Sequence, residues 1–542
     1  MSEGRSDLHR PMVSLVGAGP GDPGLITVRG LECLRTADVV VHDHLIPRRL
    51  LAHAREGAEL IDVGYASPQA PSAQIAQEAI SYLVADKARE GKYVVRLMWG
   101  DPFVFDRGGE EALFLHEQHV PYEVVPGIPA GIAIPAFAGV PVTYPGGGDT
   151  ITLVRGHEDD SRSLPALDWA SLARLEGTLV CYAGSQQLPR ILQALVSHGW
   201  PEDGQALIVY DGTLPSQECV SGSVRELLDG LLEPPVHAAR HTALHPASEP
   251  TRRPAILVAG RVVGLREHLR WFDVRPLFGR RVLVTRPRDQ AADLVDRLAA
   301  LGADAVEAPM IRIVPPEDPE PLLRAAAEPD AFDWIVFSSA NGVDAFMAAL
   351  VHGDRDIRAL KGPRLCTVGT GTAERLARYG IKVDLVPEEF RAEAVVAALA
   401  TQGLLAAARV LLPRADIGRD VIADELRGRG AIVTEVIAYR TVPDEARRDE
   451  DPDVYGMLLE RTIDVVTFTS ASAVRNFAAI YGADQASDLL KNTAVATIGP
   501  VTAEAVTELG IQVTIQPGVY TIPALVDAIA AHFAGVKGTR TA

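Results

Sequence analysis

The sequence contains little cysteine and no group of residues with the spacing of a zinc site. Its 542 residues include four cysteines, which are Cys33, Cys181, Cys219 and Cys366. No two of them form a CxxC pair, and so few, scattered cysteines exclude a disulfide framework. We therefore expect a protein of the reducing cytoplasm that needs no metal.

The chain also lacks long apolar runs and an excess of positive charge. No run approaches the roughly 18 apolar residues of a membrane helix, and the polar stretch Met1–Arg10 lacks the apolar core of a signal peptide. The net charge of −19 argues against bulk nucleic-acid binding, which requires a basic face. An acidic protein that binds an acidic ligand must place arginines locally, because its overall field repels such a ligand. We expect neither membrane nor nucleic-acid partners.

Apolar, β-rich runs alternate with amphipathic helical stretches along almost the whole chain. This alternation predicts α/β layers with largely parallel sheets, and the length suggests three or four folding domains. The expected strands are Met12–Gly17, Val39–Asp43, Tyr93–Leu97, Thr178–Tyr182, Arg281–Thr285, Trp334–Ser338, Val410–Pro413 and Val465–Thr469. Expected helices include Gln77–Arg89, Asp289–Leu301 and Val421–Arg429.

Three stretches look like seams between folded parts. Tyr144–Asp149 is rich in glycine, and Glu233–Pro254 is rich in proline, histidine and alanine. Around Arg275–Gly279 a new β-unit begins, and we place the main domain boundary there. The expected domains are residues 1–275 and 276–542.

The C-terminal half contains an internal repeat. The segment "RVLVTRPRDQAADLVDRLAALGA" from Arg281 returns 128 residues later. "DWIVFSSANGVDAF" from Asp333 returns after 131 residues, and "TVGTGTAERLARYGIKV" from Thr367 after 130. Three matched segments in one order indicate a duplicated α/β unit, and two facing copies would form a cleft. Gly, Ser and Thr cluster after its strands, where open α/β sheets bind ligands.

The first strand leads into a glycine-rich turn, Gly17–Gly24, which at first sight suggests a nicotinamide or flavin site. Pro20 and Pro23 argue against it, because each removes a backbone N–H that would face a pyrophosphate. The turn is better suited to bring bare backbone close to an uncharged or cationic ligand.

From about Met12 to Gly264 the sequence resembles the tetrapyrrole methyltransferase family, and specifically uroporphyrinogen-III C-methyltransferase. The resemblance rests on "GAGPGDPGLITVRGLECLRTADVVVHD", "GDPF…RGGEE", "VVPGI", "DWASLARLEGTLVCYAG" and the "DGT…Q" of Asp211–Gln217. It implies a two-lobed domain that binds S-adenosylmethionine, with Asp43 as proton acceptor. The implied cofactor-binding residues are Pro20, Trp99, Gly100, Asp101, Val104, Pro129, Ala130, Ala183 and Gly212.

The sequence departs from the family pattern at several of these positions. The family has glycine where Trp99 stands, so this indole either fills the cofactor slot or stacks on the adenine. Tyr65 stands where the family has a lysine that is a proposed proton donor. Further departures are Met98, Pro129, Ala130, Ala183 and Asp106, the last in place of glycine.

From Phe278 to about Phe533 the chain resembles uroporphyrinogen-III synthase, in the segments "VLVTRP", "DWIVFSSANGV", "TVGTGTAERL", "VLLPRADIGRDVIADEL", "GAIVTEVIAYRTV", "VVTFTSASAV" and "ATIGPVTAEAV". The resemblance implies two α/β lobes joined by a short strand ladder. One lobe would hold residues 279–314 and the chain after 442, and the other the middle. Tyr439 matches the tyrosine proposed to assist the leaving hydroxyl. Candidate substrate-binding residues are Ser338, Ser339, Asn341, Thr370, Thr372, Arg414, Ser470 and Thr502.

These candidates also have purely structural interpretations, which stay open at this point. Asp43 could simply form a hydrogen bond within a turn, and Tyr439 could be an ordinary tyrosine at the end of a strand. Ser339 and Thr372 suit helix N-caps. A structural ion pair is plausible for at least one of the repeat-related pair Arg286 and Arg414. The set Arg96, Arg107, Glu110 and Glu111 could be a solvated ion-pair network.

Together these features predict a bifunctional enzyme that closes hydroxymethylbilane to uroporphyrinogen III and methylates it to precorrin-2, on the siroheme or cobalamin route. One alternative is a synthase whose methylase-like half is non-catalytic or has another substrate. A second is a nicotinamide-dependent oxidoreductase that acts on tetrapyrroles. The family resemblance also suggests a homodimer formed through the methyltransferase half.

Overall fold

The computed structural model describes residues 12–64, 77–156, 166–232, 254–352, 355–387, 392–403, 405–416, 421–443 and 452–536. The chain divides into two compact units. The first comprises residues 1–280 with 299–304, and the second comprises residues 281–298 with 305–542. The expected boundary after residue 275 stays a prediction. Within the described residues, no helix is long and apolar enough to cross a membrane.

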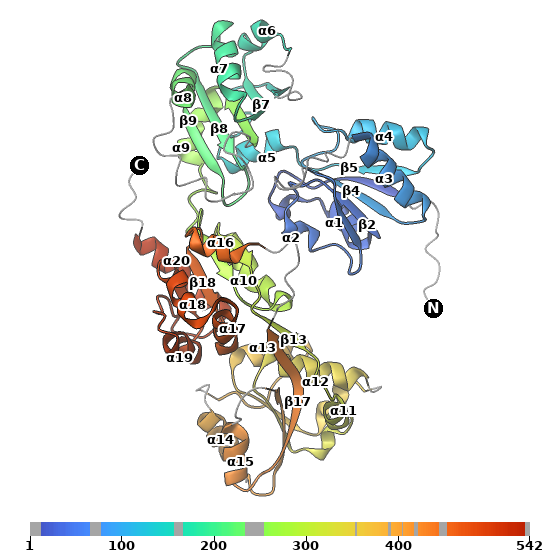
Figure 1. Ribbon diagram of the computed structural model, residues 1–542, viewed down its shortest axis with the longest axis vertical. Helices are drawn as coiled ribbons and strands as arrows, with labels where there is room; N and C mark the ends of the chain where they lie inside the picture. Colours follow the sequence, from blue (N-terminus) through green and yellow to red (C-terminus); the bar gives the residue numbers. More distant parts are fainter. Residues whose placement is uncertain are drawn as a thin grey trace. The chain divides into compact units, whose positions relative to one another are not determined.

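The first sheet is entirely parallel, with strand order β3-β2-β4-β1-β5. Its central strands are buried along their whole length, as expected for a sheet covered on both faces. Two apolar clusters fill these faces, one under α3 and α4 and the other under α1 and α2 (Figure 1). The elements are β1 Val13–Gly17, α1 Val28–Thr36, β2 Val39–His42, α2 Arg48–Leu51, β3 Glu59–Asp62, α3 Gln77–Arg89, β4 Val94–Met98, α4 Gly108–Glu117 and β5 Tyr122–Val125.

The second sheet has the order β6-β7-β10-β8-β9 and is mostly antiparallel. Only β6 and β7 run parallel, so the expectation of largely parallel sheets is wrong here. For one of the three antiparallel pairs the cause is the link between β8 and β9, because its seven residues are too few for a parallel crossover. The elements are α5 Ala130–Phe137, β6 Ile151–Arg155, α6 Trp169–Ala173, β7 Thr178–Gly184, α7 Leu188–Ser197, β8 Gln205–Tyr210, β9 Glu218–Ser223, α8 Val224–Leu232, β10 Pro254–Ala259 and α9 Arg266–Leu269.

The third sheet, of order β12-β11-β18-β19, combines strands from the two ends of the second unit. Strands β11, β18 and β19 are parallel neighbours and are fully or almost fully buried. Its elements are β11 Arg281–Val284, α10 Arg288–Ala300, β12 Asp304–Glu307, α16 Val454–Leu459, β18 Val465–Phe468, α17 Ala471–Tyr481, α18 Ala483–Leu490, β19 Ala494–Thr497, α19 Pro500–Glu508 and α20 Ile522–Val536.

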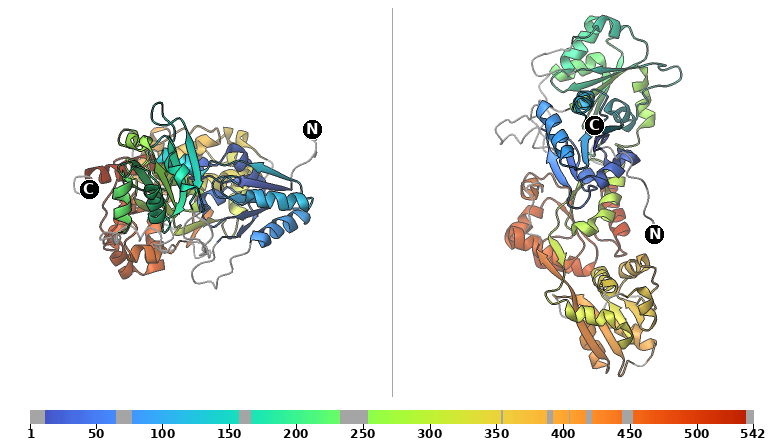
Figure 2. Two further views of the ribbon diagram at one scale, coloured as in Figure 1. Left: turned by 90° about the horizontal axis from the view of Figure 1, so that it is seen from above. Right: turned by 90° about the vertical axis from the view of Figure 1, so that its right-hand side faces the viewer.

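The fourth sheet has the order β13-β17-β16-β14-β15 and is built from the middle of the second unit. This part of the chain is drawn in yellow and orange in Figures 1 and 2. Only β13 is antiparallel; it pairs with the end of β17 and forms the expected strand ladder between the lobes. The elements are β13 Ile311–Val314, α11 Glu320–Ala327, β14 Trp334–Phe337, α12 Ala340–His352, β15 Arg364–Thr367, α13 Thr370–Arg378, α14 Ala392–Thr401, β16 Arg409–Ala415, α15 Val421–Gly428 and β17 Ile432–Pro443.

The two copies of the sequence repeat do not form one sheet each. The orders β12-β11-β18-β19 and β17-β16-β14-β15 are equivalent, because β16 repeats β11 and β18 repeats β14. Each sheet therefore takes the opening half of one copy and the closing half of the other. The lobe composition implied by the family resemblance is confirmed for β11, β12, β18 and β19, whereas β13, which was expected in the same lobe, pairs with β17 of the fourth sheet. The picture of two separate facing copies is wrong.

Candidate active sites

Three glycines at the carboxyl edge of the first sheet bring bare backbone together. Gly17 ends β1, while Gly100 and Gly127 follow β4 and β5. A Cβ atom on Gly127 would overlap the carbonyl oxygen of Gly100, and Gly100 has a φ of 72° that favours glycine. Gly19 and Gly100 also exchange two backbone hydrogen bonds, of 3.1 and 2.9 Å. We call the surface formed by these four residues the glycine cradle.

Asp101 ties the loops of the glycine cradle to each other. It is 8% exposed, its Oδ1 accepts from the Phe103 N–H at 2.8 Å, and its Oδ2 accepts from the Gly127 N–H at 3.0 Å. Its carbonyl oxygen accepts from the Val104 N–H at 3.2 Å. Asp101 therefore has a positioning role within its own loop, and its carboxylate oxygens are already used by backbone donors.

Contacts at the start of α5 connect the cradle with the second sheet. Pro129 stands at the N-cap position of α5 and Ala130 is buried behind it. The hydroxyl of Tyr182 accepts a 2.7 Å hydrogen bond from the Gly131 N–H, and Tyr182 immediately precedes Ala183 in β7. The end of β7 is thereby fixed against the first turn of α5.

A second connection joins the turn after β1 to the loop between β8 and β9. The Asp22 N–H donates to the hydroxyl oxygen of Thr213 at 3.0 Å, two residues after Pro20. Gly212 packs so closely on Ile134 of α5 that a Cβ atom would overlap that side chain. These contacts bring all nine expected cofactor-binding residues into one connected set of loops. Their role in binding stays a prediction.

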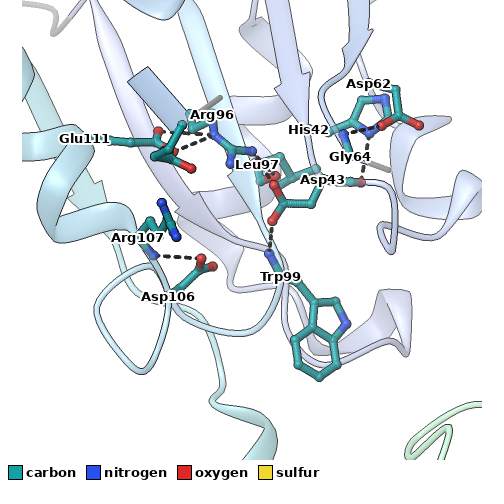
Figure 3. A network of polar contacts seen from close by, with 11 residues as sticks. His42, Asp43, Asp62, Gly64, Arg96, Leu97, Trp99, Asp106, Arg107 and Glu111 are labelled. Atoms are coloured by element: carbon teal, nitrogen blue, oxygen red, sulfur yellow. Dashed lines mark hydrogen bonds and ion pairs between the residues drawn. The ribbon is translucent and has the colours of Figure 1, made fainter. Parts of the chain in front are cut away.

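Trp99 begins the loop after β4, and its side chain is half-buried between apolar clusters of the first and second sheets. Its peptide N–H donates to Asp43 Oδ2 at 3.0 Å, while its indole points away from Arg96 (Figure 3). The indole therefore leaves the Asp43 carboxylate uncovered. The two expected roles of this indole, filling the cofactor slot or stacking on the adenine of the cofactor, stay predictions.

A buried arginine joins two carboxylates beside the cradle. Arg96 of β4 is 3% exposed, and its Nη1 lies 2.7 Å from Asp43 Oδ1 while its Nε lies 3.1 Å from Glu111 Oε2. Glu111 is 1% exposed and also accepts from the Gln77 amide at 2.7 Å. The interpretation as a solvated network is therefore wrong for Arg96 and Glu111, which are buried by the packing of α3 and α4.

The interpretation as a solvated ion pair is confirmed for Arg107 and Glu110. Arg107 Nη1 lies 3.9 Å from Glu110 Oε2, and the two side chains are 43% and 68% exposed. Such a pair contributes little to stability, because solvent screens it.

Asp106 adds a third carboxyl group next to Arg96 (Figure 3). It is half-buried, and its Oδ1 accepts a 2.8 Å hydrogen bond from the Arg107 N–H. Burial, followed by the negative charge of Asp43, raises the pKa of Asp106 to about 7. The sequence marked Asp106 only as a departure from the family, and no local signal revealed its environment. Tyr65 and residues 233–253 of the second seam lie outside the described residues.

In the second unit, Tyr439 meets Ser339. The two hydroxyl oxygens are 3.0 Å apart, and Tyr439 is 8% exposed. Tyr439 lies inside β17, opposite the irregularity between Arg414 and Ala415 of β16, so it is not a strand-end residue. Ser339 also caps α12, because its hydroxyl accepts from the Gly342 N–H at 3.1 Å. The expected N-cap at Ser339 is therefore confirmed. Ser338 beside it is exposed.

The other serine and threonine candidates stand at the starts of helices. Ser470 caps α17 by accepting from the Ala473 N–H at 3.2 Å. Thr370 is the first residue of α13, and the expected N-cap at Thr372 is wrong, because Gly369 occupies that position. Thr372 and its repeat partner Thr502 are instead the buried third residues of α13 and α19.

Arg414 and Asn341 already have protein partners. Arg414 Nε lies 2.8 Å from Glu435 Oε2, so the structural ion pair expected for at least one of the repeat-related arginines is confirmed at Arg414. The amide of Gln290 on α10 donates to Asn341 Oδ1 at 2.6 Å. The roles of both residues in substrate binding stay predictions.

Sequence reasoning did not single out Tyr182, Thr213 or Gln217 as parts of the first site. Gln217 accepts from the Thr213 N–H at 2.9 Å and so supports the loop that carries Gly212. The "DGT…Q" motif contained this signal, whereas nothing in the sequence indicated the hydrogen bond to the hydroxyl of Tyr182.

Comparisons with known proteins match both units. The family described as Tetrapyrrole (Corrin/Porphyrin) Methylases matches residues 12–228, and the family described as Uroporphyrinogen-III synthase HemD matches residues 292–527. The "Porphyrin biosynthesis protein HemD" of Ruminiclostridium josui is 34% identical over 96% of this chain and 98% of its own length.

A further relative and a solved structure are methyltransferases by name. The "Uroporphyrinogen-III C-methyltransferase" of Bacillus subtilis is 34% identical over 71% of this chain and 75% of its own. A crystal structure of "Uroporphyrin-III C-methyl transferase from Thermus thermophilus complexed with S-adenyl homocysteine" is 34% identical, covers 47% of this chain and 99% of that chain, and has a TM-score of 0.38.

The two family matches follow the order of the two units of the structure, and the relative from Ruminiclostridium josui matches almost the whole chain. The methylase match covers the first sheet, whose carboxyl edge carries the glycine cradle, and most of the second sheet. The synthase match covers most of the repeat that forms the third and fourth sheets. The chain therefore belongs to the family of tetrapyrrole-biosynthesis enzymes that join a tetrapyrrole methylase to a uroporphyrinogen-III synthase in one polypeptide.

Proposed function

We propose that this enzyme closes hydroxymethylbilane to uroporphyrinogen III in its second unit and methylates that product to precorrin-2 in its first unit. The observation that carries the methylation half is the carboxylate of Asp43, held next to the glycine cradle by Arg96 and the Trp99 N–H. A backbone cradle beside a fixed carboxylate suits a reaction that needs alignment and a base.

The residues of the first unit fit S-adenosylmethionine. The glycines of the cradle let the loops after β1, β4 and β5 pack backbone against backbone, because a Cβ atom on Gly17 or Gly127 would overlap the neighbouring loop. A Cβ atom on Gly100 would meet only the Ala130 nitrogen at 3.9 Å, so a ligand can approach the backbone there. Pro20, Pro129, Ala130, Ala183 and Gly212 would surround the cofactor. When bound, S-adenosylmethionine supplies an electrophilic methyl group.

Asp43 would accept the proton that leaves the tetrapyrrole once a ring carbon has bonded the methyl group. The ion pair with Arg96, at 2.7 Å, fixes one carboxylate oxygen, and the Trp99 N–H fixes the other. The side chain is 25% exposed, so one face remains accessible to a substrate. A base held in this way needs little reorganisation at the moment of proton transfer.

In the second unit, Tyr439 would donate a hydrogen bond to the departing hydroxyl of hydroxymethylbilane. Ser339 lies 3.0 Å from the phenol oxygen and can accept its proton or orient it. The helix starts at Thr370 and Ser470, and the exposed Ser338 just before α12, present N–H and hydroxyl groups that suit the carboxylates of the substrate. Loss of water and closure of the inverted ring require no cofactor.

A product assay tests both halves. Purified enzyme receives hydroxymethylbilane under anaerobic conditions, with and without S-adenosylmethionine, and the products are separated by chromatography and identified by mass. We expect the type-III ring without the cofactor and a dimethylated product with it. Type-I product alone would contradict the synthase half, and a type-III ring that is never methylated would contradict the methylation half.

Two variants assign the residues, each with a matched control. Asp43→Ala should block methylation, whereas Asp86→Ala, on an exposed part of α3, should not. Tyr439→Phe should slow ring closure, whereas Tyr455→Phe, 40% exposed on α16, should not. Unchanged kinetics in Asp43→Ala or Tyr439→Phe would remove that residue from its role.

A further inference from the structure

Three carboxyl groups surround one buried cation in the first unit. Arg96 uses its Nη1 for Asp43 and its Nε for Glu111. Asp106 lies on the side of Arg96 where Asp43 lies, between Arg107 and Trp99 (Figure 3). One positive charge cannot balance three negative charges in a site that is largely shielded from water. The arrangement therefore favours a proton on one of the three carboxyl groups.

Asp106 is the carboxyl group with the weakest support for a negative charge. Asp43 and Glu111 each form an ion pair with Arg96, whereas Asp106 accepts a hydrogen bond from the neutral Arg107 peptide N–H. The charged groups that act on Asp106 are Asp43 after β2, Arg96 of β4 and Glu111 of α4. Burial and the charge of Asp43 raise its pKa to about 7, so the neutral acid is present near neutral pH.

The loop that carries Asp106 is held in one conformation. Phe105 has a φ of 57°, which non-glycine residues rarely adopt, and its ring packs edge-on against Tyr182 at 4.9 Å between centroids. The Gly108 N–H closes the loop on the Pro102 carbonyl at 3.0 Å. A strained residue that is locked by its neighbours often occurs at a functional site. The Asp106 side chain is therefore oriented by the fold and not by chance.

We propose that Asp106 is the proton donor that works together with Asp43 as acceptor in the methylation site, an inference that rests on the proposed methyltransferase activity. Two carboxyl groups whose surroundings separate their protonation states are the usual arrangement for an acid and a base in one site. Asp43 forms an ion pair with Arg96, whereas Asp106 accepts a backbone hydrogen bond from the Arg107 N–H, and this difference assigns the two roles.

The proton movements balance within this pair. After a ring carbon has used an electron pair to bond the methyl group, the macrocycle carries one positive charge, and Asp43 removes it by accepting a proton from one ring position. Asp106 delivers its proton to a second ring position and, once ionised, takes a proton back from a third, so the double bonds of the macrocycle move. Asp43 then releases its proton to water, and the net result is one proton released for each methyl group.

The first test compares Asp106→Asn with Asp106→Glu and with Glu110→Gln as the matched control. Glu110 stands in the first turn of α4 and its side chain is 68% exposed. Initial methylation rates are measured from about pH 5.5 to 9. We expect the wild-type rate to fall about tenfold per pH unit above pH 7, because the donor is then ionised. Asp106→Asn should be about 100-fold slower and lack this pH dependence. Asp106→Glu should regain part of the rate, and Glu110→Gln should match the wild type.

A second measurement does not depend on activity. Infrared difference spectroscopy of the full-length protein between about pH 6 and 8 should show a carboxylic-acid carbonyl band that is lost as pH rises and is missing in Asp106→Asn. If the wild type methylates but the Asn variant keeps both its rate and its pH dependence, the donor role is wrong. If the wild type forms no methylated product while S-adenosylmethionine binds by calorimetry, the methyltransferase assignment itself fails, and the donor role fails with it.

Discussion

Replacing Arg96 by methionine should strongly destabilise the first sheet, because the change leaves a carboxylate buried without its cation. Arg96 and Glu111 are 3% and 1% exposed, and their side chains meet at 3.1 Å. After Arg96→Met the Glu111 carboxylate keeps only the Gln77 amide. Asp43 also loses its partner, but it is 25% exposed and can be hydrated.

The size of the effect follows from the desolvation of Glu111. Removing one partner of a buried ion pair typically costs about 3–5 kcal/mol, because the remaining charge must be protonated or must draw water into the core. That is a large part of the roughly 5–15 kcal/mol that stabilises an ordinary domain. Replacing both partners by apolar residues is often close to neutral. Glu111→Leu in the Arg96→Met background should therefore recover all but about 1 kcal/mol.

Native-state hydrogen exchange is the suitable assay, because the chain has two compact units and a single unfolding curve would mix them. The readout is the opening free energy of amides in β4 and β1, which pair along Val13–Gly17. Arg107→Met is the control, because its ion pair is exposed and longer, so a change below about 1 kcal/mol is expected.

The double-mutant cycle decides whether the reasoning holds. We expect the double variant to be more stable than Arg96→Met alone, with a coupling energy of at least about 2 kcal/mol between the two sites. Independent, additive losses at Arg96 and Glu111 would refute the reasoning. So would a loss below about 1 kcal/mol in Arg96→Met, which would mean that water or another cation replaces the guanidinium.

Three further predictions concern the cradle, the second unit and the pH dependence of stability. Gly127→Ala should weaken S-adenosylmethionine binding in calorimetry by at least about tenfold, because its Cβ overlaps the Gly100 carbonyl oxygen; Gly109→Ala, with open space around it, should bind normally. Ser339→Ala should lower the rate of ring closure and the melting temperature, because the hydroxyl both meets Tyr439 and caps α12, and the cap alone contributes about 1 kcal/mol. An unchanged rate with the lower melting temperature would limit Ser339 to capping. Because the pKa of Asp106 is raised to about 7, the folded state binds a proton that the unfolded chain releases above about pH 4. The contribution of this bound proton to the free energy of unfolding is complete below about pH 4 and is lost as pH rises through about 7. From about pH 5 to 8, Asp106→Asn should therefore gain about 1–2 kcal/mol over the wild type in chemical unfolding, after allowance for solvent screening; a constant difference would contradict the raised pKa.

Much of the architecture could be read from the sequence, because it depends on local patterns. Helix α3 spans the predicted Gln77–Arg89, and β14 spans nearly all of the predicted Trp334–Ser338. Hydrophobic periodicity and turn residues decide such elements within a few positions. The repeat offsets of 128 to 131 residues likewise anticipated the equivalence of β11 with β16 and of β14 with β18.

Tertiary structure decided which strands share a sheet. Neither copy of the repeat forms a sheet alone, because each sheet combines halves of both copies. Strand β8 is as apolar and buried as the parallel strands, and the short link to its antiparallel neighbour β9 separates the two arrangements. Pairing depends on contacts between residues that are far apart in the chain, which no local pattern contains.

The candidate site likewise combines residues that the sequence marks with properties that only the folded chain has. The sequence by itself marked Asp43, Gly100, the turn Gly17–Gly24 and Tyr439 as candidates, because the order of its motifs resembles two known families. It did not single out Gly127 of the cradle. It left Arg96 and Glu111 open as a solvated network, and it marked Asp106 only as an unusual residue. Burial, the sharing of one guanidinium and the resulting proton on Asp106 arise only when β2, β4 and α4 pack together. Protonation follows the local dielectric and the neighbouring charges, and both are properties of the folded chain.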